Sequence, residues 1–210
     1  MPAEGLSRIQ SAQKRSFDVA LALVGLVVTS PLCAVAWLVA TASTRRNGIF
    51  RQTRIGRHGE PFTVLKIRTM RAVGGTTVTT ANDARITRAG AAMRRLKVDE
   101  LPQLINVLRG DMSLVGPRPD VSGFADELHG SDRIVLSVRP GITGPAAIAY
   151  RHEEDLLASA EDPEAYNRDV IWPDKVRINR AYVENWSLAA DIRCISDTIK
   201  SVLTTEEVRP

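Results

Sequence analysis

The chain has 210 residues, 44% of them hydrophobic, which is enough for one domain with a core and a membrane anchor. The net charge is only +4, but residues 45–118 carry 15 Lys and Arg against five Asp and Glu. Aromatic residues make up 5%, two cysteines are far apart and three histidines are scattered, which argues against a nucleic-acid partner, a disulfide framework and a metal-binding cluster.

The first predicted element is a charge-free segment at residues 19–44, long enough for a membrane helix. Ser30 and Pro31 fall near its middle, where proline removes a backbone donor and bends a helix. Both flanks are basic, and the positive-inside rule then places both in the cytoplasm. The pattern favours a re-entrant helix–break–helix, and a single kinked spanning helix is the alternative.

A strand is predicted at residues 62–70, where β-branched and aromatic residues alternate with polar ones. The alternation puts Lys66 and Arg68 on one face together with Phe62 and Val64. Two cations on a mostly apolar strand suit an anionic ligand or a nearby acid. A solvated strand end is the alternative.

Three helices are expected further along. The first is basic and amphipathic at residues 84–97, with Asp83 as its N-cap. The second is short, at residues 100–109, with Asp99 as its N-cap and a stop at Gly110. The third begins at Ser187 and has an apolar stripe, which suits either a core helix or an amphipathic helix at the membrane interface.

Asp99 and Glu100 are adjacent carboxylates in a strongly basic region. Carboxylates act as nucleophiles, general bases or metal ligands, and an Asp before an apolar run also commonly serves as a helix cap. Attack on a diphosphate needs positive charge nearby. The sequence offers it from arginines and a lysine, and Mg²⁺ held by the pair would add to it. These cations are Lys66, Arg68, Arg94, Arg95 and Arg118.

Ordered blocks along nearly the whole chain resemble those of the small monotopic phosphoglycosyl transferases, the bacterial sugar transferases that start glycoconjugate assembly. Their number and compatible spacing make the resemblance specific. The blocks are KRSFD at 14–18, the Ser30-Pro31 pair, FRQTRIG at 50–56, KIRTM at 66–70, RITR at 85–88, DELPQL at 99–104, NVLRGDMS at 106–113, VGPRP at 115–119, RPGITG at 139–144 and NWS at 185–187.

The resemblance implies a reaction. Asp99 would attack the β-phosphate of a UDP-sugar and release UMP, and a polyprenyl (undecaprenyl) phosphate would then take the covalent phosphosugar. Glu100 would support acid–base chemistry and Mg²⁺ binding. Arg94 and Arg118 match phosphate-contacting arginines, and we expect Lys66, Arg68 and Arg139 to bind substrate as well.

The fold expected from these observations is α+β. It comprises a re-entrant membrane hairpin at residues 1–46 and a small, mostly helical catalytic domain at 47–210, with a short β element and interfacial amphipathic helices. The resemblance implies a location on the cytoplasmic face of the bacterial inner membrane, in contact with lipid, and leaves a homodimer open.

The chain departs from the family pattern after Gly144. Relatives often have a large apolar or aromatic residue followed by Ala-Gln, whereas this chain has Pro145-Ala146-Ala147. The departure affects the expected contacts to the sugar or nucleotide. It leaves the Asp99–Glu100 pair untouched.

Overall fold

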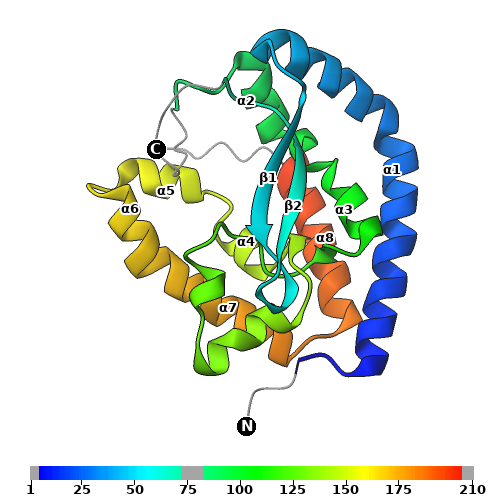
Figure 1. Cartoon of the computed structure of the whole chain (residues 1–210), viewed down its shortest axis with the longest axis vertical. Helices are drawn as coiled ribbons and strands as arrows, with labels where there is room; N and C mark the ends of the chain where they lie inside the picture. Colours follow the sequence, from blue (N-terminus) through cyan, green and yellow to red (C-terminus); the bar gives the residue numbers. More distant parts are fainter. Residues whose placement is uncertain (1–4, 72–82, 205–210) are drawn as a thin grey trace.

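A computed structural model describes residues 5–71 and 83–204, a mixed and mostly helical arrangement (Figure 1). It begins with α1 (Arg8–Thr44), whose start is fixed by a reciprocal pair of hydrogen bonds between Ser7 and Gln10. Figure 1 shows α1 rising along one side of the molecule and then turning across its top.

α1 stays helical through Pro31. Proline at this position leaves the carbonyl of Val27, four residues earlier, without its helical donor. The Ser30 hydroxyl donates to that carbonyl at 3.0 Å, which satisfies it locally. The sequence predicted a break between two helices. The structure instead has a bend within one continuous helix, because a neighbouring side chain replaces the lost backbone bond.

Both arms of α1 pack against the rest of the chain. Ala22 in the first arm is buried with Leu104 and Val107 of α3 (Gln103–Arg109). Ala36 and Ala40 in the second arm pack on Ile67 and Val98. The outward face of α1 exposes large apolar residues, which are Leu21, Leu23, Val24, Val27, Val28, Leu32, Val35, Trp37, Leu38 and Val39.

A hairpin of β1 (Ile49–Ile55) and β2 (Pro61–Ile67) follows, with Ile49 opposite Ile67 and a 3₁₀ turn, η1 (Arg57–Gly59), between the strands. Asn106 of α3 locks this hairpin in place. Its side chain accepts from Leu65 N at 3.0 Å and donates to Thr63 O at 2.7 Å. The predicted strand is confirmed, although β2 ends before Arg68.

Two of the predicted helices start later than expected. α2 (Arg88–Arg95) is capped by Thr87, whose hydroxyl accepts from Gly90 N, while Asp83 binds Arg85 instead. α3 begins after Pro102, which has no N–H with which to extend the preceding turn. Asp99 therefore lies in a separate 3₁₀ turn, η2 (Val98–Glu100), and is not the N-cap of α3.

Two short parallel strands, β3 (Ser113–Val115) and β4 (Gly141–Thr143), bring together the VGPRP block at 115–119 and the RPGITG block at 139–144. They approach so closely that a Cβ on Gly141 would lie 2.2 Å from Gly116 N. Only glycine fits at such a distance. This contact sets where the chain leaves β3 for Arg118.

The second half of the chain is mostly helical. The helix expected to begin at Ser187 is α8, for which Ser187 is the N-cap. The main core cluster joins α7 and α8 to β3 through Tyr182, Cys194 and Val115. The remaining elements are η3 (Ala125–Glu127), η4 (Gly130–Ser137), α4 (Pro145–Ala149), α5 (Glu153–Ser159), α6 (Pro163–Tyr166), a π-helical turn η5 (Asn167–Ile171), α7 (Trp172–Glu184) and α8 (Leu188–Leu203).

Candidate active site

The two carboxylates singled out in the sequence lie against the second arm of α1. Lys97, in a left-handed conformation with φ of 54°, turns the chain from α2 into η2. Val98 then packs into the cluster with Ala36 and Ala40. Asp99 and Glu100 are consequently 9% and 8% exposed.

Glu100 is held by two cations from distant parts of the chain. Its Oε1 accepts a hydrogen bond from Arg118 Nη2 at 2.8 Å and lies 3.5 Å from Lys66 Nζ. Burial by itself would raise the pKa of Glu100, but the charges of Arg118 and Lys66 outweigh it and lower that pKa well below its usual range. Glu100 is therefore an ionised and fixed carboxylate.

Asp99 has a different environment. Its Oδ1 is buried and has no hydrogen-bond partner within residues 5–71 and 83–204. Burial, and then the negative charge of Glu100, raise the pKa of Asp99 to about 6. Two adjacent carboxylates with such different pKa values suit different chemical roles. The one with an unpartnered oxygen is the better placed to attack or to bind a metal.

Lys66 and Arg118 meet the dyad as the sequence suggested. Burial lowers the pKa of Lys66 to about 8, against the opposing charge of Glu100. Arg118 is brought over by the turn after β3, and its guanidinium is still partly open to solvent. The carboxylate of Glu100 therefore meets Lys66 of β2, which is the first of the two alternatives considered for the cations on this strand.

Arg94, on the last turn of α2, lies close enough to influence Asp99 electrostatically. Its guanidinium contacts Glu154 of α5 and, at 3.8 Å, Met70 Sδ. Arg95, the next residue, is exposed. Arg94 thus borders the dyad but is paired with an acid from another helix.

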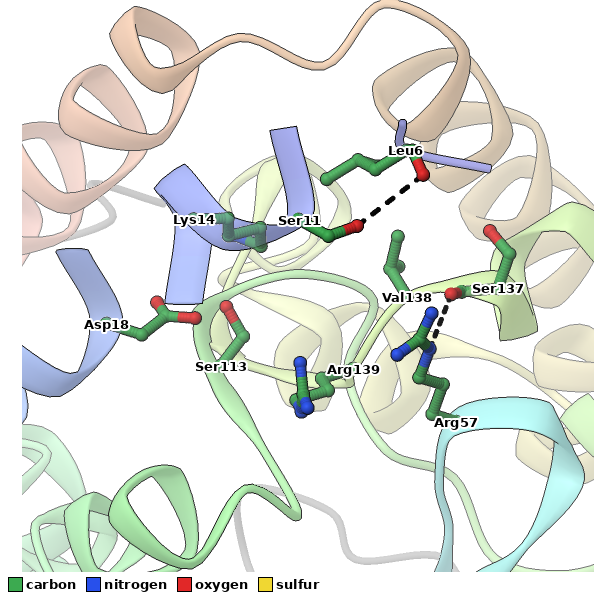
Figure 2. A pocket seen from close by; sticks show the side chains of 9 residues that line it. All are labelled: Leu6, Ser11, Lys14, Asp18, Arg57, Ser113, Ser137, Val138 and Arg139. Atoms are coloured by element: carbon green, nitrogen blue, oxygen red, sulfur yellow. Dashed lines mark hydrogen bonds between the residues drawn. The ribbon is translucent and has the colours of Figure 1, made fainter. Parts of the chain in front are cut away.

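The structure does not bring Arg68 or Arg139 to the dyad. The Arg68 guanidinium donates to Asn47 O at 2.9 Å and lies over the Phe50 ring, at the turn between α1 and β1. Arg139 donates through Nε to Gly110 O at 2.7 Å. It lines a hollow beside the N-terminal turns of α1, here called the foot of α1 (Figure 2). Their expected role in binding substrate remains a prediction.

Sequence analysis missed several charged residues around Arg118. Burial raises the pKa of Asp120 to about 6, although Lys175, Arg54 and Arg118 oppose it. Lys175 lies 2.6 Å from Glu153. Asp120 follows the Arg118 turn directly, which was an available signal. Lys175 and Glu153 come from α7 and α5, and nothing local in the sequence marks them.

The residues present fit a magnesium ion that takes only one or two ligands from the protein. Within the described residues, no group of three or more His, Cys, Asp or Glu side chains could hold a metal ion. Mg²⁺ commonly takes one or two carboxylates and completes its shell with substrate phosphates and water. The unpartnered Oδ1 of Asp99 meets that requirement, with Glu100 beside it.

Comparison with known proteins identifies the family of this chain. The family described as bacterial sugar transferase matches residues 9–205. The exopolysaccharide production protein ExoY of Sinorhizobium fredii is 34% identical over 212 residues, covering 92% of this chain and 87% of that protein. UDP-glucose:undecaprenyl-phosphate glucose-1-phosphate transferase of Caulobacter vibrioides is 37% identical over 202 residues, covering 92% and 71%.

The Escherichia coli protein of that same name is 37% identical over 206 residues, covering 94% of this chain and 41% of that protein. The family match extends over nearly the whole chain, and its range spans both the long apolar helix and the acidic dyad. The chain therefore belongs to the bacterial sugar transferase family, a family of transferase enzymes.

Proposed function

We propose that this protein transfers a sugar 1-phosphate from a UDP-sugar to a polyprenyl phosphate, the first membrane step in assembling an exopolysaccharide or related glycoconjugate. The names of its relatives support the substrate classes, since they include transferases that use UDP-glucose and undecaprenyl phosphate. The observation that carries the proposal is Asp99, a buried carboxylate with one unpartnered oxygen and a pKa of about 6.

The reaction proceeds in two displacements. The Asp99 carboxylate attacks the β-phosphorus of the UDP-sugar, the bond from that phosphorus to the bridging oxygen breaks, and UMP leaves. An oxygen of the polyprenyl phosphate then attacks the aspartyl phosphosugar and releases Asp99. The product is a polyprenyl diphosphate sugar, and covalent catalysis has divided one difficult step into two.

The neighbouring side chains prepare this nucleophile. At pH 7 a carboxyl with a pKa of about 6 is mostly ionised, as attack requires. Lys66 and Arg118 keep Glu100 in position and bring positive charge to where the diphosphate must lie. When bound, Mg²⁺ supplies further neutralisation of the diphosphate, and Asp99 and Glu100 are the residues that would hold it.

We propose that α1 enters the cytoplasmic leaflet of the bacterial inner membrane and returns to the same side. The most apolar stretch of 18 residues in α1 has a mean hydropathy of 2.4, and only 11% of it is buried in the protein. Both arms of α1 pack on the same body, through Ala22 and through Ala36 with Ala40. Four exposed apolar residues support contact with the interface, and they are Leu96, directly after α2, Ile105 of α3, and Ile192 and Ile199 of α8.

A direct test measures UMP release by the purified chain from a panel of UDP-sugars, with undecaprenyl phosphate and Mg²⁺. Asp99→Asn should lose on the order of 10³-fold or more in rate. Asp169→Asn, at an exposed aspartate of η5 that pairs with Arg168, serves as the matched control. Mass spectrometry of the reaction without acceptor should place a phosphosugar on Asp99.

An adduct on any other side chain, or unchanged UMP release from Asp99→Asn, would refute the mechanism. Salt-sensitive binding to liposomes without turnover of any UDP-sugar would instead identify a non-catalytic membrane-surface module.

A further inference from the structure

A second group of cations lies at the foot of α1, apart from the dyad. It surrounds a hollow of about 20 Å³ that is partly enclosed and is lined by Ser11, Lys14, Asp18, Arg57 and Arg139 among others (Figure 2). The enclosed part has room for about one water-sized group. It can therefore take the oxygens of a ligand whose body stays outside.

Two arginines reach this hollow in the same way. Arg57 Nε donates to Ser137 O at 2.8 Å, and Arg139 Nε donates to Gly110 O at 2.7 Å. Each guanidinium is thus anchored by its inner nitrogen. The terminal nitrogens of both groups have no hydrogen-bond partner among the residues that the structure describes. Paired N–H donors in this planar fork match phosphate oxygens.

The nearby acids are already engaged. Asp18 accepts from Leu114 N at 3.0 Å, and Asp191 pairs with Lys14 at 2.6 Å. Burial, followed by the positive charges of Arg15 and Arg57, lowers the pKa of Arg139, and Asp18 offsets this only in part. Like charges therefore face one another across the hollow, and an anion placed between them would relieve the repulsion.

The hollow is separate from the catalytic dyad. Arg57 follows the end of β1, whereas Lys66 lies at the far end of β2 in the same hairpin. From Pro61 to Lys66 the strand spans about 17 Å at ~3.3 Å per residue. A UDP-sugar bound at Asp99 does not place its diphosphate here.

The position relative to α1 indicates the source of the anion. Ser11 and Lys14 lie on α1 five to eight residues before the charge-free segment begins at Val19, or about 8–12 Å along the helix. If α1 enters the bilayer as proposed above, Ser11 and Lys14 lie at the depth of the lipid head groups. We propose that Arg57 and Arg139 bind the phosphate of an anionic membrane lipid, which fixes the foot of α1 to the bilayer surface.

Thermal unfolding of the full chain in a neutral detergent tests the site independently of turnover. Dihexanoyl phosphatidylglycerol should raise the melting temperature by about 3 °C or more at roughly ten times its Kd. Inorganic phosphate at the same concentration should raise it less. An equal response to inorganic phosphate would overturn the assignment to a lipid.

Two variants identify the residues. Arg57→Gln should abolish the lipid-dependent rise, and Arg133→Gln, at an exposed arginine outside the hollow, should retain it. Ser11→Glu places a carboxylate in the hollow. This variant should be at least as stable as the wild type without lipid and should not respond to lipid. A full lipid-dependent rise in melting temperature in both Ser11→Glu and Arg57→Gln would overturn the proposal. Loss of UMP release would bear only on the proposed transfer reaction.

Discussion

Lys14 Nζ lies 2.6 Å from Asp191 Oδ2, although the two residues are 177 positions apart in the sequence. The side chains are 7% and 0% exposed. Tyr182 and Trp186 also donate to the Asp191 carboxylate, at 2.6 and 3.1 Å. This buried pair fixes the first arm of α1 to α8, and with it the body that carries the dyad.

Breaking this pair should strongly destabilise the protein. Lys14→Met leaves Asp191 buried without its counter-charge, and we expect a loss of about 3–5 kcal/mol in the free energy of unfolding. Lys14→Met/Asp191→Asn removes both charges and keeps an acceptor for Tyr182, so it should recover much of that loss. Denaturant titration in detergent measures both.

Asp197→Asn is the control for the previous prediction, because its pairing with Lys200 on the same helix is exposed. It should change the free energy of unfolding by less than about 0.5 kcal/mol. A double variant no more stable than Lys14→Met would show that the pair acts through something other than an uncompensated charge.

The rate of the first half-reaction should follow a bell-shaped pH profile. Asp99, with its pKa near 6, becomes protonated and loses nucleophilicity as the pH falls through that value. Lys66, with its pKa near 8, loses its charge as the pH rises through that value. Burst measurements of UMP release without acceptor, between pH 5 and 9, report both limbs.

Lys66→Arg should remove the alkaline limb, because arginine stays charged in this range. Glu100→Gln should shift the acid limb of any residual activity downward, since the charge of Glu100 helps to raise the pKa of Asp99. A flat profile from pH 5 to 7 would exclude Asp99 as the titrating nucleophile.

Gly90 sets the position of α2 and therefore of Arg94. A Cβ added there would lie 2.1 Å from the backbone oxygen of Thr69. Gly90→Ala should cost about 1–3 kcal/mol through overpacking and raise KM for the UDP-sugar, because α2 must move. Ala91→Ser, at an exposed position on the same turn, should leave both stability and KM unchanged. A normal KM in Gly90→Ala would remove Arg94 from donor binding.

Cysteine labelling can decide the path of α1. After Cys33 and Cys194 are replaced by serine, single cysteines at Ser7 and Asn47 report the two flanks of the helix. In inside-out vesicles a membrane-impermeant maleimide should label both, because both arms pack on one body. Labelling of only one flank would establish a single spanning helix.

Local patterns in the sequence were enough to identify the apolar helix, strand β2 and the start of α8. Each depends on composition, periodicity or a cap within a few neighbouring residues. They were not enough for the N-termini of α2 and α3. There, Thr87 and Asp83 compete for the cap, and Pro102 interrupts the turn that contains Asp99.

The membership of the dyad follows from the order of residues along the chain, since Asp99 and Glu100 are neighbours whatever the fold. The chemical difference between them depends on how distant segments pack. Glu100 receives Lys66 from a hairpin and Arg118 from a turn after β3, while Asp99 Oδ1 receives no partner among the described residues. Charges act through space, so pKa values depend on which distant segments pack together, and a linear pattern does not contain that information.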